Sequence, residues 1–275
     1  MRNYVVWVHG IGKQTPGDYK PFEDAIRASL ARQVLRRTGQ TPPPDAVVWE
    51  DAYWAKVTQD DQDKLKRILG VEGTLRTLLV DSLGDAIAYS RVAGGGGKYA
   101  EVQGVFAQAL DKLSRRAREL EGPEVKVPLT VIGHSLGSVI ATGTLDDLRA
   151  TGRFPANLEL KHLFTLGSPI AVYGLRYGLD NFKPRSLMGH WVNYYYGHDM
   201  IGYPLQPLGG PWASAVRNVK LSSSGGVPPW ERLQRSIVAR IWFYRNIKTH
   251  SWYFTDSRVV DAVAASLAGE WAPGR

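Results

Sequence analysis

The 275-residue sequence contains no cysteine. This absence excludes disulfide bonds, thiolate nucleophiles and zinc sites with cysteine ligands, and it leaves the redox compartment undetermined. No stretch approaches the roughly 20 consecutive apolar residues that a membrane-spanning helix needs. The apolar run near the N-terminus is too short for a signal peptide and has no small-residue cleavage site. We therefore expect a soluble, cytoplasmic protein without stable membrane insertion, and secretion stays open.

Dense blocks of one charge are also missing. The net charge is +8 and the isoelectric point is near 9.6, but the Lys and Arg residues are scattered along the chain. A nucleic-acid-binding face would gather such residues in one patch, so we expect no nucleic-acid partner. No long low-complexity linker divides the chain, and its 44% hydrophobic and 22% charged residues are ordinary for a globular protein. We therefore predict a single domain over residues 1–275, with homo-oligomer formation left open.

The most informative stretch reads L-T-V-I-G-H-S-L-G over residues 129–137. An apolar, β-rich run ends in Gly133, and the spacing Gly-x-Ser-x-Gly continues through Ser135 and Gly137. This pattern predicts a strand that turns sharply into a helix, with glycines where the strand and the helix crowd the serine. The hydroxyl would lie at a helix N-terminus, where backbone N–H groups favour developing negative charge. The alternative interpretation is a structural serine in a glycine-rich turn.

Strand-like and helix-like segments alternate along most of the chain. We predict six strands, over residues 4–8, 46–54, 125–132, 160–166, 191–196 and 216–221. We predict helices over residues 21–38, 101–120, 138–148 and 257–267, and an irregular connection over residues 170–185. This alternation indicates an α/β fold with a mainly parallel sheet.

Residues 56–99 interrupt the alternation. They contain charged helical material and a more apolar helix, and they include four consecutive glycines without any strand signal. A small cap over a site and a helical layer packed on the sheet fit this insertion equally well. A phosphate-binding loop does not fit, because Val92 and Tyr99 stand where it needs glycine and Ser or Thr. Residues 230–248 predict a further helix that could act as a lid or a subunit contact.

Two polar residues that could assist the serine follow strands later in the chain. Asp199 comes after the strand at 191–196, and His250 comes after the last strand. A serine hydroxyl is too weak an acid to attack an ester unaided, so a histidine must accept its proton and a carboxylate must orient that histidine. We therefore predict that Ser135 attacks, that His250 transfers the proton and that Asp199 orients His250.

Each predicted catalytic residue has competitors. They are His190 and His198 for the base, Asp180 and Asp256 for the acid, and Ser168 for the nucleophile. Neighbouring residues at a strand end point in opposite directions. His198 is therefore poorly placed to bond Asp199 and to face Ser135 at the same time. Ser168 is the weaker nucleophile because Pro169 removes a backbone donor beside it. For His134 we predict packing or hydrogen bonding rather than proton transfer.

Five short motifs are spread over nearly the whole chain. They are H-G-I-G at residues 9–12, G-H-S-L-G at 133–137, L-G-S-P at 166–169, Y-G-H-D at 196–199 and T-H-S-W-Y at 249–253. Together they resemble the bacterial serine esterases and lipases of the α/β-hydrolase superfamily, and L-G-S-P is similar to the class 3 lipases in particular. The order serine, aspartate, histidine along the chain is also that of this superfamily. The resemblance implies hydrolysis of carboxylic esters through an acyl-enzyme, without a metal or organic cofactor.

The resemblance further implies an oxyanion hole and a fold. The oxyanion would be bound by the backbone N–H groups of Ile11, in the H-G-I-G loop, and of Leu136, which follows the serine. The superfamily normally has one or two antiparallel strands before the strand that leads to this loop, and the sequence has no room for them. We therefore expect an α/β-hydrolase fold with a trimmed, mainly parallel sheet of about six strands flanked by helices, and a helical cap or insertion before the nucleophile elbow.

These inferences lead to one preferred function and several alternatives. The preferred function is that of a carboxylesterase cleaving short- to medium-chain carboxylic esters, with a small-molecule ester as its binding partner. A lipase or phospholipase acting on lipid esters is the first alternative, and a thioesterase or amidase follows. A non-catalytic binding protein with a hydrolase fold is the alternative from a different class.

Overall fold

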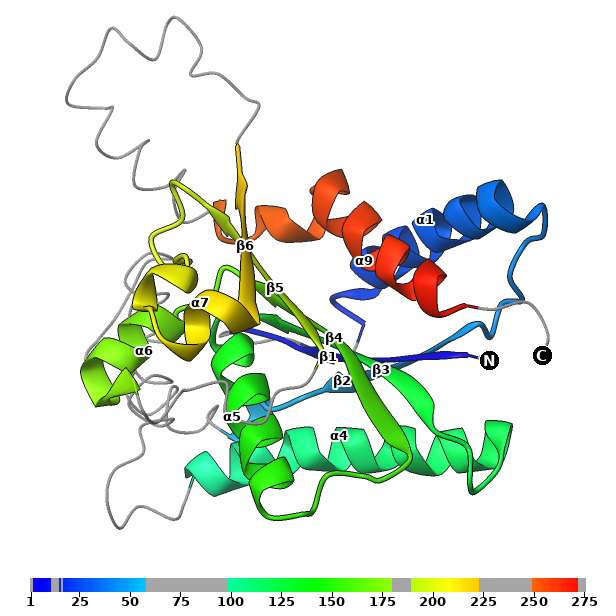
Figure 1. The fold of residues 1–275 in the computed structure, drawn as a ribbon, viewed down its shortest axis with the longest axis horizontal. Coiled ribbons are helices and arrows are strands. Elements are labelled where there is room, and N and C mark those ends of the chain that lie inside the picture. The colour runs from blue at the N-terminus through cyan, green and yellow to red at the C-terminus, as the bar shows by residue number, and fades with distance from the viewer. Residues whose placement is uncertain are drawn as a thin grey trace, which may run out of the picture.

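A computed structural model describes residues 2–10, 15, 17–57, 98–179, 189–222 and 249–271. Within this part of the chain, one sheet has the strand order β2-β1-β3-β4-β5-β6, and all neighbouring strands are parallel (Figure 1). The strands are β1 (Asn3–Val8), β2 (Val47–Ala52), β3 (Val127–His134), β4 (Leu158–Leu166), β5 (His190–Tyr196) and β6 (Val216–Leu221). The predicted α/β class and the predicted parallel sheet of six strands are confirmed.

Helices cover both faces of the sheet. Helices α1 (Lys20–Thr38) and α9 (Ser257–Glu270) lie on one face, and α4 (Lys98–Glu121) and α5 (Leu136–Ala150) lie on the other (Figure 1). Shorter elements follow β4 and β5 or precede α9: α6 (Ile170–Tyr177), η2 (Gln206–Leu208), α7 (Pro211–Ala215) and η4 (Trp252–Phe254). The strand order reverses between β1 and β3, and ligands bind at such a switch point, beyond the carboxyl ends of the strands.

The burial of strand β1 on both faces explains why residues 4–8 form a continuous apolar run. All six of its residues are buried. Tyr4, Val6 and Val8 point to the core beneath α4 and α5, whereas Val5 and Trp7 point to the core beneath α1 and α9. Successive side chains of a strand alternate between faces, so a strand covered on both faces needs apolar residues at every position.

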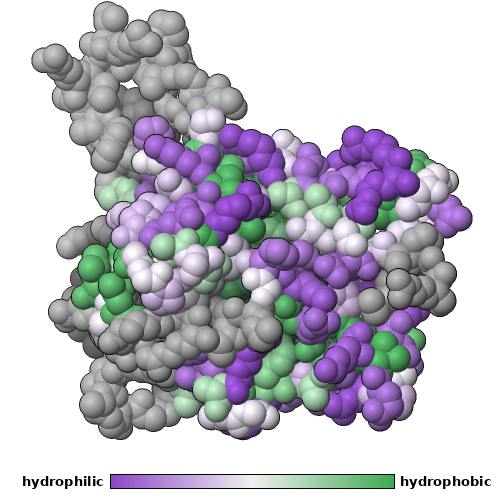
Figure 2. Space-filling model, in the orientation of Figure 1, coloured by the Kyte–Doolittle hydropathy of each residue, from purple (hydrophilic) through white to green (hydrophobic). Residues whose placement is uncertain are grey.

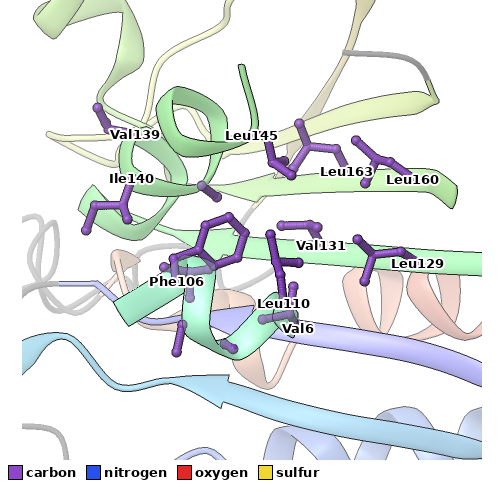
Figure 3. Packing of buried hydrophobic residues seen from close by; sticks show 14 of the residues in the cluster. Val6, Phe106, Leu110, Leu129, Val131, Val139, Ile140, Leu145, Leu160 and Leu163 are labelled. Carbon is purple, nitrogen blue, oxygen red and sulfur yellow. The ribbon is translucent and has the colours of Figure 1, made fainter. Parts of the chain in front are cut away.

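The core beneath α4 and α5 anchors the helix that follows the G-H-S-L-G motif. Phe106 and Leu110 of α4 lie beside Val131 of β3 and Val6 of β1, and Leu145 of α5 reaches the same layer (Figure 3). All five side chains are fully buried. This packing holds α5 against the central strands.

The structure corrects several boundaries. Part of the connection predicted as irregular, residues 170–185, is the helix α6, which at eight residues is too short for a clear helical period. Strand β3 continues to His134 because the last two residues pair with β4. The sequence analysis also missed η2 and α7. None of the helices within the described ranges is long and apolar enough to cross a membrane.

Three predicted features lie outside the described residues, wholly or in large part. These are the insertion at 56–99, of which residues 58–97 are not described, the helix at 230–248, and the end of the connection at 170–185.

Candidate active site

Ser135 occupies the sharp turn between β3 and α5. Its backbone angles are φ 53° and ψ −131°, and among the described residues it is the only non-glycine with a positive φ. A side chain in such a conformation costs about 1–3 kcal/mol, and this kind of strain is concentrated at functional sites. The Ser135 N–H donates to the carbonyl of Leu166 at 2.9 Å, and the Ser138 hydroxyl donates to the carbonyl of Ser135 at 2.6 Å. The strand, turn and helix that the motif predicts are therefore present.

Helix α5 packs directly on the end of β1 at Gly137. A Cβ atom there would lie 2.2 Å from the carbonyl oxygen of Val8 and 2.3 Å from that of His9. We expect Gly137→Ala to lower the free energy of unfolding by about 3 kcal/mol, measured by denaturant titration, because the added methyl group forces strand and helix apart.

Gly104→Ala is the matched control for this variant. Gly104 lies within α4, where an added Cβ meets no described atom within 4 Å. Alanine favours helix over glycine by about 1 kcal/mol, so this variant should be slightly more stable than the native chain. Unchanged stability of Gly137→Ala would contradict the close packing of α5 on β1.

The structure places Asp199 and His250 in contact, although they are 51 positions apart. The Nδ1 atom of His250 lies 3.0 Å from Oδ1 and 2.9 Å from Oδ2 of Asp199. The same carboxylate accepts hydrogen bonds from the N–H of Ile201 at 2.9 Å and from the hydroxyl of Tyr253 at 2.7 Å. Its side chain is 0% exposed.

These contacts determine the charge state of the Asp199 carboxyl. Burial alone would raise the pKa of the Asp199 carboxyl, but His250 and the other donors outweigh it and lower this pKa to about 2. At neutral pH the carboxylate is therefore ionised and can only accept hydrogen bonds. It follows that Nδ1 of His250 carries the hydrogen of this contact, and in the neutral form of the ring the lone pair is then on Nε2.

The Nε2 atom of His250 is buried and has no hydrogen-bond partner within the described ranges. Leaving a buried polar atom unpaired costs about 1–3 kcal/mol. Other buried side-chain atoms of the described residues are unpaired too, among them Nε1 of Trp7 and Nδ1 of His134, so being unpaired does not by itself mark a catalytic atom. A lone pair held in this way can accept a proton from a reacting group.

Gly167 connects the serine turn to the Asp–His pair. It follows Leu166, whose carbonyl holds Ser135, and a Cβ atom at Gly167 would lie 2.9 Å from both Asp199 Oδ2 and His250 Cε1. Ser135 follows β3, Gly167 follows β4 and Asp199 lies just after β5, and these three strands are neighbours in the sheet. The structure thus brings the predicted nucleophile, acid and base to one edge of the sheet.

His134, beside Ser135, packs against His250. The two ring centroids are 4.6 Å apart, and the Nε2 atom of His134 lies 2.7 Å from the carbonyl oxygen of His250. Since a carbonyl only accepts hydrogen bonds, Nε2 of His134 is the donor. Burial, and then the neighbouring His250, lower the pKa of His134 to about 3. His134 is therefore neutral at physiological pH and has the packing and hydrogen-bonding role predicted for it.

His9 and Gly10 are the described part of the predicted oxyanion loop, and Ile11 lies outside the described residues. The His9 ring stacks on Trp54 with centroids 5.1 Å apart, and the backbone N–H of Trp54 donates to Nε2 of His9 at 3.3 Å. Nδ1 of His9 therefore donates to the carbonyl of Gly10 at 2.7 Å. Burial lowers the pKa of His9 to about 4, so the ring is neutral and fixes the start of the loop.

The loop backbone runs directly beside the serine. A Cβ atom at Gly10 would lie 2.7 Å from the Cβ atom of Ser135, which leaves no room for a side chain at this position. Leu136 is the first residue of α5, and the first N–H groups of a helix have no partner within the helix. Of the two donors predicted for an oxyanion, the structure therefore describes the position of Leu136 alone.

Two competitors have structural partners that explain them. Asp256 is the N-cap of α9, where it accepts from the N–H of Arg258 and from the hydroxyl of Tyr196. Ser168 is fully buried, and its hydroxyl oxygen lies 2.7 Å from that of Ser138. Both residues stabilise local structure.

The remaining competitors lie away from the serine or outside the described residues. His190 begins β5 at its amino end, where its ring stacks on His162 with centroids 5.8 Å apart. His198 is exposed, and Asp180 lies outside the described residues. Within the described ranges, no group of three or more His, Cys, Asp or Glu side chains is arranged to hold a metal ion.

Tyr253 is the residue at this site that the sequence analysis missed. It lies in η4, three positions after His250, and it is fully buried. Its position in the T-H-S-W-Y motif was visible in the sequence. Only the structure shows that its hydroxyl reaches the carboxylate of Asp199.

No protein-family profile matches the chain, and no curated protein sequence matches it significantly. Among solved structures, an iodinated complex of an acetyl xylan esterase is similar at 12% identity and a TM-score of 0.36, with 98% of this chain and 99% of that chain covered. An uncharacterized protein from Pseudomonas aeruginosa is similar at 12% identity and a TM-score of 0.38, with 99% of this chain and 51% of that chain covered. Likenesses this weak do not indicate an activity for this chain.

Proposed function

We propose that this protein is a serine hydrolase of the α/β-hydrolase type that cleaves carboxylic esters. In this proposal Ser135 is the nucleophile, His250 is the general base and Asp199 orients His250. The observation that carries it is the buried Asp199–His250 pair, with an unpaired Nε2 atom, at the sheet edge where Ser135 is held in strained backbone. A strained serine turn and a histidine oriented by a buried carboxylate are both what a catalytic serine needs.

Acylation begins when Nε2 of His250 accepts the proton of the Ser135 hydroxyl as the oxygen bonds to the ester carbonyl carbon. The resulting imidazolium is stabilised by the ionised Asp199 and then protonates the departing alcohol. Water enters, and its oxygen bonds to the acyl carbonyl carbon as the same nitrogen takes its proton. The nitrogen then returns this proton to the Ser135 oxygen as the bond to the acyl carbon breaks and the carboxylic acid leaves. The second half-reaction restores the starting state of all three residues.

The negative charge that forms on the carbonyl oxygen needs donors. The N–H of Leu136 at the start of α5 is one, and we assign the second to Ile11 on the resemblance of the H-G-I-G loop alone. No metal or organic cofactor takes part in this scheme. Each donor of an oxyanion hole typically contributes about 10²- to 10³-fold to kcat.

Esters with short to medium acyl chains are the preferred substrates in this proposal, and lipid esters are the runner-up. Helix α6, which begins three residues after Gly167, carries two exposed apolar side chains: Val172 is 48% and Leu175 is 76% exposed. Figure 2 shows hydrophobic surface over this helix at the left of the molecule. Apolar surface on the helix that follows Gly167 favours an apolar acyl group, and a larger apolar contact would favour a lipase or phospholipase.

Labelling by a fluorophosphonate tests the proposal, because only an activated serine reacts. We expect one phosphonyl group per chain, located on Ser135 by mass spectrometry of the peptides. Ser168→Ala is the matched control and should still be labelled. Absence of labelling in the folded native chain would favour the non-catalytic binding protein, and labelling at another serine would remove Ser135 as the nucleophile.

A further inference from the structure

The hydroxyl of Tyr253 makes two hydrogen bonds inside the protein. It donates to Oδ2 of Asp199 at 2.7 Å and accepts from the backbone N–H of Tyr196 at 3.1 Å. Tyr253 is 0% exposed, so water does not compete for these bonds. The phenol therefore links the end of β5 to the carboxylate that holds His250.

The surroundings of Asp199 leave its carboxylate little room to take another orientation. Gly167 approaches it so closely that a Cβ atom there would lie 2.9 Å from Oδ2 and 2.8 Å from the Tyr253 ring. Oδ1 is held by the N–H of Ile201 at 2.9 Å. The titratable groups packed around it in the described part of the chain are His250, Tyr253 and, behind His250, the neutral His134.

We propose that Tyr253 is a positioning residue whose hydroxyl fixes the Asp199 carboxylate in its contact with His250 and withdraws part of its negative charge. This inference rests on the proposed function. Burial and the neighbouring Asp199 raise the pKa of Tyr253 above its ordinary value, which keeps the phenol protonated as a donor at every working pH.

The two effects of the hydroxyl have different consequences for the kinetics. Without it, Asp199 is less firmly oriented, so kcat should fall while the binding of substrate is unchanged. Without the hydroxyl, the carboxylate would also keep more of its negative charge facing His250, and this charge stabilises the imidazolium. Because kcat/KM requires neutral His250, its acid limb should move to higher pH.

The test compares Tyr253→Phe with the native chain over a range from about pH 4 to pH 9. We expect kcat to fall about tenfold, the size of effect that loss of one hydrogen bond to a charged group produces. We expect KM to stay within about twofold, since Tyr253 does not touch the substrate. The midpoint of the acid limb of kcat/KM should rise by about half a pH unit.

Tyr196→Phe is the matched control. The Tyr196 hydroxyl also donates to a carboxylate, that of Asp256, and its ring packs against Tyr253 with centroids 4.9 Å apart. This variant removes a bond of the same kind from the same packing, but one outside the proposed triad. It should lose comparable stability and keep the native pH profile.

Should Tyr253→Phe fail to fold, meta-fluorotyrosine incorporated at position 253 keeps the ring and makes the hydroxyl a stronger donor. The acid limb should then move to lower pH. An unchanged acid limb in either folded variant would overturn the positioning role.

The outcome is separable from that of the proposed function. If Ser135→Ala keeps its activity, the proposed function fails before Tyr253 is considered. If Ser135→Ala is inactive and Tyr253→Phe behaves like Tyr196→Phe, only the role of Tyr253 is wrong.

Discussion

Replacing Ser135 by Ala should abolish ester hydrolysis, with kcat for p-nitrophenyl esters reduced by at least about 10⁵-fold. The reason is that in the proposed mechanism the Ser135 hydroxyl oxygen, at the turn between β3 and α5, forms the acyl-enzyme, and alanine lacks this oxygen. The bonds that hold the turn use the backbone N–H and carbonyl of Ser135, and alanine keeps both. We therefore expect the circular dichroism spectrum and the thermal unfolding temperature to stay close to those of the native chain.

Ser168→Ala distinguishes the two serines that follow a strand end. Its hydroxyl bonds Ser138 and the N–H of Ile170 in the interior, so its loss should lower stability and leave turnover within about an order of magnitude. Activity retained by Ser135→Ala would show that the strained turn has another purpose, and the binding-protein interpretation would then be preferred.

Replacing Asp199 by Asn should lower kcat by about 10³- to 10⁴-fold at neutral pH. The side-chain amide introduced by this change can donate to Nδ1 of His250, and this favours the tautomer with a hydrogen on Nε2. That nitrogen then cannot accept the serine proton. Steady-state rates on the same esters measure the effect, and removing the imidazole itself by His250→Ala should have at least as large a consequence.

Asp256→Asn is the control for the acid. Asp256 accepts from the N–H of Arg258 and caps α9, so this change should cost about 1 kcal/mol of stability and little activity. A fall in rate for Asp256→Asn with near-normal rates for Asp199→Asn would reverse the assignment of the acid. His198→Ala provides the same comparison for the base, since His198 is exposed.

The elements of the fold could be predicted from the sequence because their signals are local. The strand at Tyr4–Val8 follows from an apolar run bounded by a breaker, and the predicted bounds of β6 at Val216–Leu221, with its mixed sequence V-R-N-V-K-L, match the structure. The turn at Ser135 could be predicted because glycine is needed where the helix packs on the strand. A Cβ atom at Gly137 would lie 2.2 Å from the carbonyl oxygen of Val8. Helix α6 was missed, since eight residues give too little periodicity.

The candidate site divides in the same way. The sequence by itself determined the kinds of chemistry available, through the Gly-x-Ser-x-Gly spacing and the order of Ser135, Asp199 and His250. The roles of these residues remain predictions. Only the tertiary structure decided that Asp199 and not Asp256 contacts His250, and that Tyr253 completes the surroundings of the carboxylate. The physical reason is that these contacts depend on which strands become neighbours in the sheet, and no local pattern encodes the meeting of residues 51 positions apart.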